Sequence, residues 1–217
     1  MLTDRRPAMM GGKHEVINMT NVLIIGATGT LGSAARQTLL KETDAQLTLL
    51  ARHANRLQAT PGRERVVAGS VTDSATLDDA IAGQDFVFAA LSGDLPTYAQ
   101  AIVDAMKCQG VKRLAFISSM GIYGELPARL GGDGTVAPVL RPYRQAADIV
   151  EESGLDYTVI RPGWFTGGPV NYELTVKGEP FGGHDASVAS IADLVKRLVV
   201  EPGFGVKESL GINTPGS

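Results

Sequence analysis

The chain has 217 residues, with 20 lysines and arginines against 23 aspartates and glutamates, and a formal net charge of -3. This balance argues against a nucleic-acid partner, because a nucleic-acid surface requires a basic patch. The hydrophobic content of 44% and the charged content of 20% are ordinary for a globular protein. Apolar runs extend over only a handful of residues, too short to cross a bilayer, so no membrane partner is expected. The length favours one domain with a substantial core.

The cysteine and histidine content predicts neither a disulfide nor a metal site. The single cysteine, Cys108, cannot form an internal disulfide, which is typical of a reducing, cytoplasmic location. The three histidines, His14, His53 and His184, are scattered and lack metal-ligand spacing. We expect each of them to be a surface residue.

Residues 1–18 differ from the rest of the chain in having no hydrophobic periodicity. They also lack an apolar segment of the length that a signal peptide needs. Met19 stands just before the first predicted strand. We therefore expect residues 1–18 to be a flexible N-terminal extension and residues 19–217 to form the domain.

Strands and helices alternate from residue 21 onward. Strands are predicted from short apolar runs, and helices from amphipathic segments bounded by capping residues or glycine. The expected strands are residues 22–25, 46–51, 64–68, 86–91, 113–117, 157–161 and 208–212, and the expected helices are residues 31–40, 74–81, 97–109, 142–153 and 190–200. Residues 124–142 are rich in glycine and proline, which indicates a long functional surface loop. The alternation predicts an α/β fold with a doubly wound parallel sheet in a single domain.

The junction between the first strand and the first helix has the sequence GATGTLG at residues 26–32. Gly26 allows a sharp bend, Gly29 allows the backbone to approach a phosphate, and Gly32 allows the helix to pack against the sheet. The start of the helix offers unpaired N–H groups and the positive end of a dipole to a pyrophosphate. The spacing is a variant of the G-x-G-x-x-G pattern, and a purely structural tight turn is the alternative. The predicted cofactor-binding residues of this turn are Gly26, Thr28, Gly29, Thr30 and Leu31.

The end of the second strand distinguishes between the two nicotinamide cofactors. An acidic residue there would accept a hydrogen bond from the ribose 2′-hydroxyl of NAD. Instead, Arg52 follows the strand, and Arg56 lies one turn further along the chain. A guanidinium can pair with a 2′-phosphate through a charge-assisted fork, so NADP(H) is favoured over NAD(H). A pair of solvated surface arginines is the alternative interpretation.

Residues that close the later strands are expected near the cofactor, because ligands of such sheets lie beyond the carboxyl ends of the strands. Asp73, after the third strand, is expected near an adenine edge, with a helix cap as the alternative role. Ser92 and Gly93 close the fourth strand, where a small turn would let the nicotinamide ribose approach. Ser118 and Ser119 close the fifth strand, with hydroxyls toward the reacting end of the cofactor.

Three motifs together resemble those of the atypical short-chain dehydrogenase/reductases. They are GATGTLG at residues 26–32, FISSMGIYG at residues 116–124 and SGLDYTVIRPGW at residues 153–164. More narrowly, they are similar to the NAD(P)-binding, NmrA-like and biliverdin- or flavin-reductase-like branch. The resemblance covers roughly residues 21–201 and implies a Rossmann-like fold with NAD(P) lying across the strand ends.

The same resemblance implies roles for individual residues. Ser119 corresponds to the active-site serine of the family. Arg161-Pro162-Gly163 is implied to lie beside the nicotinamide, with Pro162 as a cofactor contact. Trp164 is implied at the mouth of the substrate pocket. Tyr123 is assigned to that pocket as well, with a packed aromatic residue whose hydroxyl reaches water as the alternative.

One catalytic feature of the wider superfamily is missing from the chain. Enzymes of that superfamily protonate a carbonyl with a tyrosine whose pKa, about 10 when free, is lowered by a lysine four residues later. Here Tyr143 is followed four residues later by Ala147. Counting back from Ser153, Tyr143 occupies the place of the lysine, and Val139 occupies that of the tyrosine. The general acid stays unassigned, with the hydroxyls of Tyr143 and Ser119 as candidate catalytic groups.

These observations predict an NADP(H)-binding oxidoreductase that transfers hydride to a small, flat, electron-poor acceptor such as a flavin or quinone. Such acceptors suit a site without a dedicated proton donor, because solvent can protonate them after hydride arrives. A non-catalytic NADP(H)-sensing regulatory protein is one alternative, since the missing dyad fits it equally well. An NAD-dependent epimerase- or dehydratase-like enzyme is the other. The expected partner is a small-molecule substrate, and the oligomeric state, monomer or homodimer, is left open.

Overall fold

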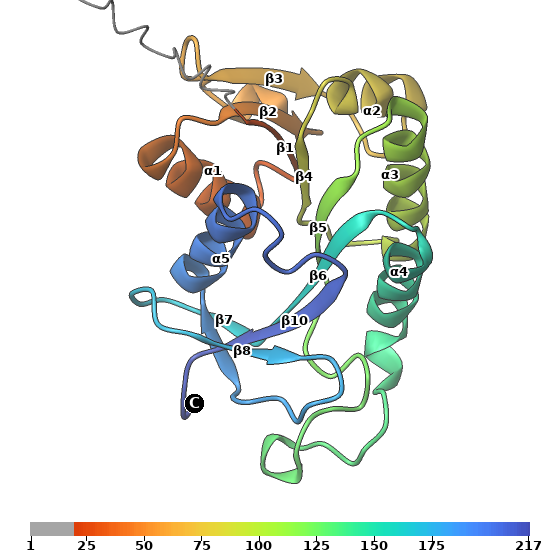
Figure 1. Cartoon of the computed structure of the whole chain (residues 1–217), viewed down its shortest axis with the longest axis vertical. Coiled ribbons are helices and arrows are strands. Elements are labelled where there is room, and N and C mark those ends of the chain that lie inside the picture. The colour runs from red at the N-terminus through yellow and green to blue at the C-terminus, as the bar shows by residue number, and fades with distance from the viewer. Residues whose placement is uncertain (1–19) are drawn as a thin grey trace, which may run out of the picture.

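The computed structural model describes residues 20–217, so the predictions of a flexible extension at residues 1–18 and of a domain start at Met19 lie outside the described residues. The described chain forms one α/β domain around an eight-stranded sheet (Figure 1). The strands of this sheet are, in spatial order, β3 (Glu64–Ala68), β2 (Gln46–Ala51), β1 (Asn21–Ile25), β4 (Phe86–Ala89), β5 (Arg113–Ile117), β6 (Asp156–Pro162), β10 (Glu208–Asn213) and β8 (Glu173–Val176). A separate two-stranded ladder joins β7 (Trp164–Thr166) to β9 (Asp185–Ser187).

Helices cover both faces of the large sheet. On one face, α1 (Thr30–Glu42) packs against α5 (Val188–Val200). On the other face, α3 (Leu95–Gln109) packs between α2 (Ser74–Ile81) and α4 (Arg141–Glu152), as Figure 1 shows. This arrangement confirms the predicted doubly wound sheet in a single domain.

The core consists of two hydrophobic clusters, one on each face of the sheet. Side chains alternate along a strand, so β1 contributes Leu23 and Ile25 to one cluster and Val22 and Ile24 to the other. All four side chains are at most 1% exposed. Burial on both faces explains why the first strand is apolar at every position.

The predicted bounds agree with the structure for residues 46–51, 64–68, 74–81 and 113–117. The other predicted elements differ by one or two residues at an end. For example, α3 begins at Leu95 rather than at residue 97, because the Asp94 carboxylate accepts a hydrogen bond from the Thr97 N–H and caps the helix.

Residues 165–189 contain strands that the sequence analysis missed. β8 and β9 lie in this segment, and β7 begins one residue before it. β8 runs antiparallel to β10, with Leu210 opposite Val176, so the expectation of an entirely parallel sheet is wrong at this edge. These strands have three or four residues each. Such short strands depend on partners distant in the sequence and leave no local pattern to detect.

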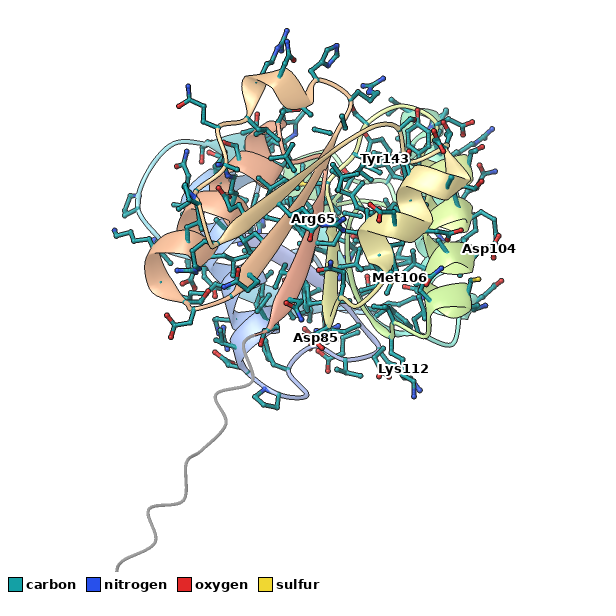
Figure 2. All side chains as sticks on the ribbon, turned by 90° about the horizontal axis from the view of Figure 1, so that it is seen from above. Arg65, Asp85, Asp104, Met106, Lys112 and Tyr143 are labelled. Atoms are coloured by element: carbon teal, nitrogen blue, oxygen red, sulfur yellow. The ribbon has the colours of Figure 1, made fainter. Side chains whose placement is uncertain are left out.

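The winding of the chain reverses beside β1. The chain passes from β1 outward through β2 to β3, returns to the other side of β1 as β4, and continues through β5 to β6. Ligands of such sheets bind in the crevice outside the carboxyl ends of the strands at this reversal. Tyr143 lies toward that end of the molecule, whereas Asp85 and Lys112, which precede β4 and β5, lie at the opposite end (Figure 2). Within residues 20–217, no helix has the length and apolar character needed to cross a membrane.

Candidate cofactor and acceptor site

The turn after β1 is tightly packed at two of its three glycines. Gly26 has a φ of +87°, and a Cβ on it would lie 2.2 Å from the carbonyl oxygen of Ala90. A Cβ on Gly32 would lie 2.2 Å from the carbonyl oxygen of Gly26. Gly29 differs, because a Cβ there would meet only the Gly26 oxygen, at 3.3 Å. The fold therefore requires Gly26 and Gly32, whereas a Cβ on Gly29 would make a single close contact, which a shift of a few tenths of an ångström would relieve.

The first turn of α1 has no side-chain cap. By contrast, α2, α3 and α5 have the N-cap residues Asp73, Asp94 and Ser187, whose side chains accept hydrogen bonds from helix N–H groups. The N-cap of α1 is Gly29, which carries no capping side chain, and no acidic residue follows in the first turn. N–H groups left uncapped at a helix N-terminus favour an anion, and the phosphates of a dinucleotide fit this donor set.

A cavity of about 160 Å³ lies between the glycine turn and the ends of β2 and β3. Gly26, Thr28 and Gly29 line it together with Arg52 and Ser70. The exposed Arg52 side chain forms no ion pair with any residue of the described range. Its guanidinium is therefore available to a phosphate at this end of the site.

A larger cavity of about 460 Å³ continues from the glycine turn toward β6 and β7. It shares Gly29, Leu91 and Ser92 with the smaller cavity, so the two form one groove across the carboxyl ends of the strands. The sequence-predicted residues that line the larger cavity are Gly29, Thr30, Leu31, Ser92, Ser118, Ser119, Tyr143, Pro162 and Trp164. The structure thus brings residues from five separate segments of the chain into this cavity.

Tyr143 stands in the cavity wall without a cationic partner one turn away. The Ser118 hydroxyl donates to the Tyr143 carbonyl oxygen at 3.2 Å and ties α4 to the end of β5. Ala147 is fully buried, and Val139, the other position expected for the tyrosine, is 75% exposed. Within the described residues, the hydroxyls of Tyr143 and Ser119 have no hydrogen-bond partner. Both hydroxyls are therefore free to bond a ligand.

The mouth of the larger cavity carries an aromatic pair that sequence reasoning missed. The Trp164 indole, 65% exposed, stacks on the His184 ring with centroids 5.8 Å apart and planes 11° apart. His184 Nδ1 also lies 2.6 Å from an Asp185 carboxylate oxygen. The sequence analysis assigned His184 only a surface role. No local signal pairs it with Trp164, because the contact arises from the β7–β9 ladder.

Two predicted cofactor residues, Asp73 and Gly93, lie outside the linings of both cavities. Asp73 lines neither cavity, and its carboxylate accepts a hydrogen bond from the Thr76 N–H at the start of α2. The alternative role as a helix cap is therefore the observed one. Gly93 also lines neither cavity, and a Cβ on it would lie 3.2 Å from the Tyr98 hydroxyl.

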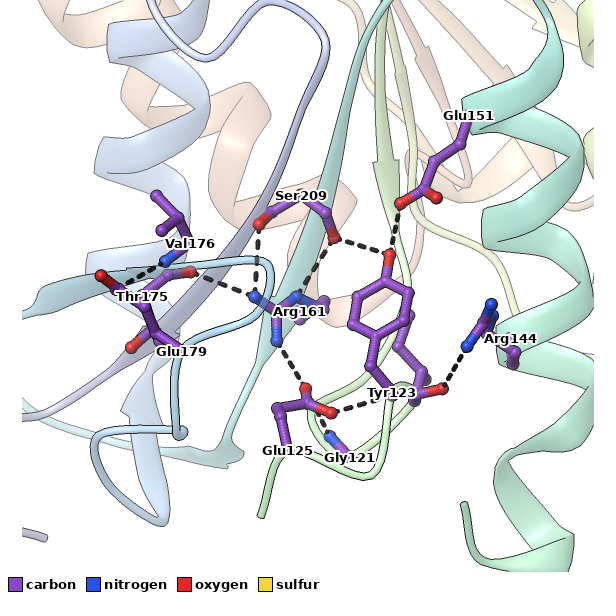
Figure 3. Close-up of polar contacts among 11 residues, drawn as sticks. Gly121, Tyr123, Glu125, Arg144, Glu151, Arg161, Thr175, Val176, Glu179 and Ser209 are labelled. Atoms are coloured by element: carbon purple, nitrogen blue, oxygen red, sulfur yellow. Dashed lines mark hydrogen bonds and ion pairs between the residues drawn. The ribbon is translucent and has the colours of Figure 1, made fainter. Parts of the chain in front are cut away.

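Two further predicted residues, Tyr123 and Arg161, lie outside the lining of the larger cavity. Tyr123 does not line the larger cavity, and its hydroxyl donates to the Glu151 carboxylate and accepts a hydrogen bond from the Ser209 hydroxyl. Arg161, implied to lie beside the nicotinamide, is fully buried and pairs with Glu125, so only Pro162 and Gly163 of that motif reach the cavity. Both side chains belong to a buried network beneath the groove (Figure 3).

The strand order, the glycine turn and the groove define a dinucleotide-binding protein of the Rossmann type. The sequence profile of a family described as NAD(P)H-binding matches residues 26–202. The chain therefore belongs to this family of atypical short-chain dehydrogenase/reductases, which confirms the resemblance seen in its motifs.

Solved structures and a curated relative extend this assignment. A Rossmann-fold NAD(P)-binding family protein from Shigella flexneri is 37% identical, with a TM-score of 0.79 and coverage of 92% of this chain and 95% of that one. A short-chain dehydrogenase/reductase from Veillonella parvula DSM 2008 in complex with NADP is 25% identical, with a TM-score of 0.82 and coverage of 91% and 95%. The NAD(P)H azoreductase of Xenophilus azovorans is 28% identical over 193 residues, which are 84% of this chain. This chain spans 64% of the length of that relative.

Proposed function

We propose that this protein is an NADP(H)-dependent reductase of small, flat, electron-poor acceptors of the flavin or quinone type. The observation that carries the proposal is the continuous groove that runs from Arg52, past Gly29, to Trp164. The groups along it follow the order of the groups along the cofactor. A cation stands at the 2′-phosphate end, uncapped helix N–H groups stand at the pyrophosphate, and two unpaired hydroxyls stand at the nicotinamide end.

The cofactor preference rests on the adenosine end. Arg52 would hold the 2′-phosphate, and the cavity beside Gly29 would admit the pyrophosphate. Ser92 and Pro162 would border the nicotinamide half in the larger cavity. When bound, NADPH supplies the hydride, so the protein's contribution is to bind, orient and exclude water. The complex of a 25% identical relative with NADP supports this cofactor.

The class of acceptor rests on the missing proton donor. Tyr143 has the buried Ala147 where a lysine would lower its pKa, and no other side chain of the described residues forms a hydrogen bond with its hydroxyl. A ketone would need a proton or a strong donor on its developing alkoxide, whereas solvent can protonate a reduced flavin or quinone. Ser119 and Tyr143 would then orient the acceptor through hydrogen bonds. The similarity to an NAD(P)H azoreductase supports reduction of a flat conjugated compound.

The test is to follow the absorbance of NADPH while FMN, menadione and an azo dye are offered in turn to the purified protein. We expect protein-dependent consumption with at least one of them, and slower consumption with NADH than with NADPH. NADPH binding without consumption, detected as a change in Trp164 fluorescence, would support the sensor instead. Absence of NADPH binding would overturn both functions.

A further inference from the structure

The buried network beneath the groove centres on Arg161 of β6, whose side chain has no exposed surface. Its Nε donates to the Ser209 hydroxyl at 3.1 Å, and its Nη2 donates to the carbonyl oxygens of Thr175 and Ser209 at 3.1 and 3.2 Å. Its Nη1 pairs with the Glu125 carboxylate at 2.5 Å (Figure 3). A buried guanidinium is unfavourable unless its N–H groups are bonded and its charge is paired. These contacts therefore hold Arg161 in one position.

Glu125 connects Arg161 to the loop that follows β5. One carboxylate oxygen accepts a hydrogen bond from the Gly121 N–H at 3.0 Å, and the other accepts one from the Tyr123 N–H at 2.8 Å. The loop turns sharply here, with φ of +82° at Gly121 and +73° at Gly124. The Glu125 side chain is only 6% exposed. It thus closes the loop on itself and fastens it to β6.

The same stretch of β6 holds the start of this loop through its backbone. The Ser118 N–H donates to the Ile160 carbonyl oxygen at 2.8 Å, and the Met120 N–H donates to the Pro162 carbonyl oxygen at 3.2 Å. Residues 118–120 all line the larger cavity. The backbone bonds thus attach residues 118–120 to β6 directly, and the ion pair between Glu125 and Arg161 attaches the loop that continues from them.

A second carboxylate in the network, Glu151, offers a matched control. It accepts a hydrogen bond from the Tyr123 hydroxyl and pairs with Lys177 at 2.6 Å. Burial and the hydrogen bond to Glu151 raise the pKa of Tyr123, so that hydroxyl stays protonated at neutral pH. Glu151 contacts side chains and no backbone N–H group of the loop. The two carboxylates share a network, but Glu125 bonds backbone N–H groups of the loop, whereas Glu151 bonds only one side chain of the loop, that of Tyr123.

We propose that Glu125 and Arg161 are positioning residues that set the place of residues 118–120 against the nicotinamide end of the cofactor. This inference rests on the proposed NADP(H) function. Neither side chain lines the cavity, so both act through the backbone of the segment that does. The isosteric change Glu125→Gln leaves one oxygen acceptor and turns an NH₂ group toward an N–H donor. It therefore weakens the loop attachment without altering any cavity-lining side chain.

The first measurement needs no cofactor. Amide hydrogen exchange of the free protein compares Glu125→Gln, Glu151→Gln and the parent. We expect residues 118–124 to exchange at least about tenfold faster in Glu125→Gln, because two of their N–H groups donate to that carboxylate. Residues 26–36 should exchange at the parent rate in both variants, and Glu151→Gln should leave residues 118–124 within about twofold of the parent.

The second measurement separates the two ends of the cofactor. NADPH is titrated through the fluorescence of its nicotinamide, and adenosine 2′,5′-bisphosphate is used as a probe of the adenosine end alone. We expect Glu125→Gln to lower NADPH affinity about tenfold and to change the emission of the bound nicotinamide, because a displacement of about 1 Å is costly at a reacting centre. Affinity for the bisphosphate should be unchanged. A general loss of stability would instead weaken the binding of both ligands.

The double variant Glu125→Gln/Arg161→Met keeps the proposal testable if the single variant folds poorly. Removing both charges avoids an unpaired buried arginine, so its thermal stability should lie close to that of the parent while its NADPH binding still falls. The inference would be overturned if residues 118–124 of Glu125→Gln exchanged at the same rate as in the parent. It would also be overturned if they exchanged faster while the NADPH affinity and the emission of the bound nicotinamide stayed unchanged. A parent protein that binds no NADPH would overturn the proposed function and the nicotinamide role together. The exchange result would still decide whether the pair holds the segment.

Discussion

The two halves of the groove are built in different ways. The half between Arg52 and Gly29 comes mostly from one continuous part of the chain, in which β1, the glycine turn, α1 and β2 follow one another. The half between Ser118 and Trp164 is assembled from the ends of β5, α4, β6 and β7, with His184 contributed by the turn before β9. The first half depends on backbone geometry that glycine permits, and the second depends on contacts between distant segments.

An ion pair, partly buried in the first half and buried in the second, accompanies each half and has a different effect in each. Arg36 of α1 pairs with Glu64 of β3 and supports the first half from outside the groove, since neither residue lines either of the two cavities that form the groove. Arg161 pairs with Glu125, which binds the loop that lines the second half. Phosphate recognition can therefore be encoded in a short segment, whereas the reacting end requires the assembled fold.

The largest expected effect breaks the first half alone. Gly29→Val places a branched side chain where the pyrophosphate would pass, so NADPH affinity should fall at least about 100-fold, which is about 2.7 kcal/mol. The fold should survive, because a Cβ at this position meets only the Gly26 oxygen, at 3.3 Å. Fluorescence of Trp164, the single tryptophan, measures NADPH affinity, and circular dichroism shows whether the variant is folded. Gly167→Val is the control, because a Cβ at Gly167 would meet no other atom within 4 Å. If Gly29→Val folds and binds NADPH as tightly as the parent does, the phosphates must lie elsewhere.

The next effect concerns the stability of the first half. Glu64→Gln should lower the free energy of unfolding by about 2 kcal/mol, because the Glu64 side chain is fully shielded and accepts hydrogen bonds from Arg36 and from the Thr60 N–H. Burial raises the pKa of Glu64, but these hydrogen bonds outweigh burial and hold the pKa below its ordinary value. As pH falls, the unfolded chain therefore takes up a proton at Glu64 more readily than the folded chain does. The stabilisation by the Glu64 carboxylate is complete above about pH 5 and is lost as pH falls through the pKa of Glu64 in the folded state. Urea unfolding of parent and variant at several pH values measures it, and an equal loss at pH 7 and at pH 3 would contradict the prediction.

Cofactor choice is expected to change less. Arg52→Ala should weaken NADPH binding about tenfold and leave NADH binding within about twofold, because only the former carries a 2′-phosphate. The difference between the two cofactors should shrink as ionic strength rises. Arg56→Ala is the control, because Arg56 does not line the smaller cavity. We expect its NADPH affinity to be close to that of the parent. Equal affinities of the parent for NADPH and NADH would remove the basis for this prediction.

The smallest effects are expected at the acceptor end. Tyr143→Phe should leave flavin or quinone reduction within about tenfold of the parent, because a general acid in the rate-limiting step would be worth about 10²–10⁴-fold. Ser119→Ala should reduce the rate about fivefold, the value of one hydrogen bond of about 1 kcal/mol. Steady-state rates with NADPH and menadione measure both. A thousandfold loss of reduction rate in Tyr143→Phe would identify this tyrosine as the proton donor. The second half of the groove would then supply a proton as well as orient the acceptor.

Much of the fold could be predicted because its signals are local. The four apolar residues from Val22 to Ile25 indicate a strand buried on both faces, and the spacing of Gly26, Gly29 and Gly32 indicates the turn that follows. The same local rules predicted the bounds of β2, β3, α2 and β5. They failed for β7, β8 and β9, whose few residues carry no period and depend on strands elsewhere in the chain.

The sequence by itself determined the fold class, the glycine turn and the position of Arg52 after the second strand, because each depends on neighbours within a few residues. Only the tertiary structure decided which polar residues face the groove. It placed Arg161 and Tyr123 in a buried network. It also brought His184 onto Trp164. The physical reason is that a polar side chain is placed by partners that satisfy its hydrogen bonds and charge, and those partners lie on segments that only folding brings together.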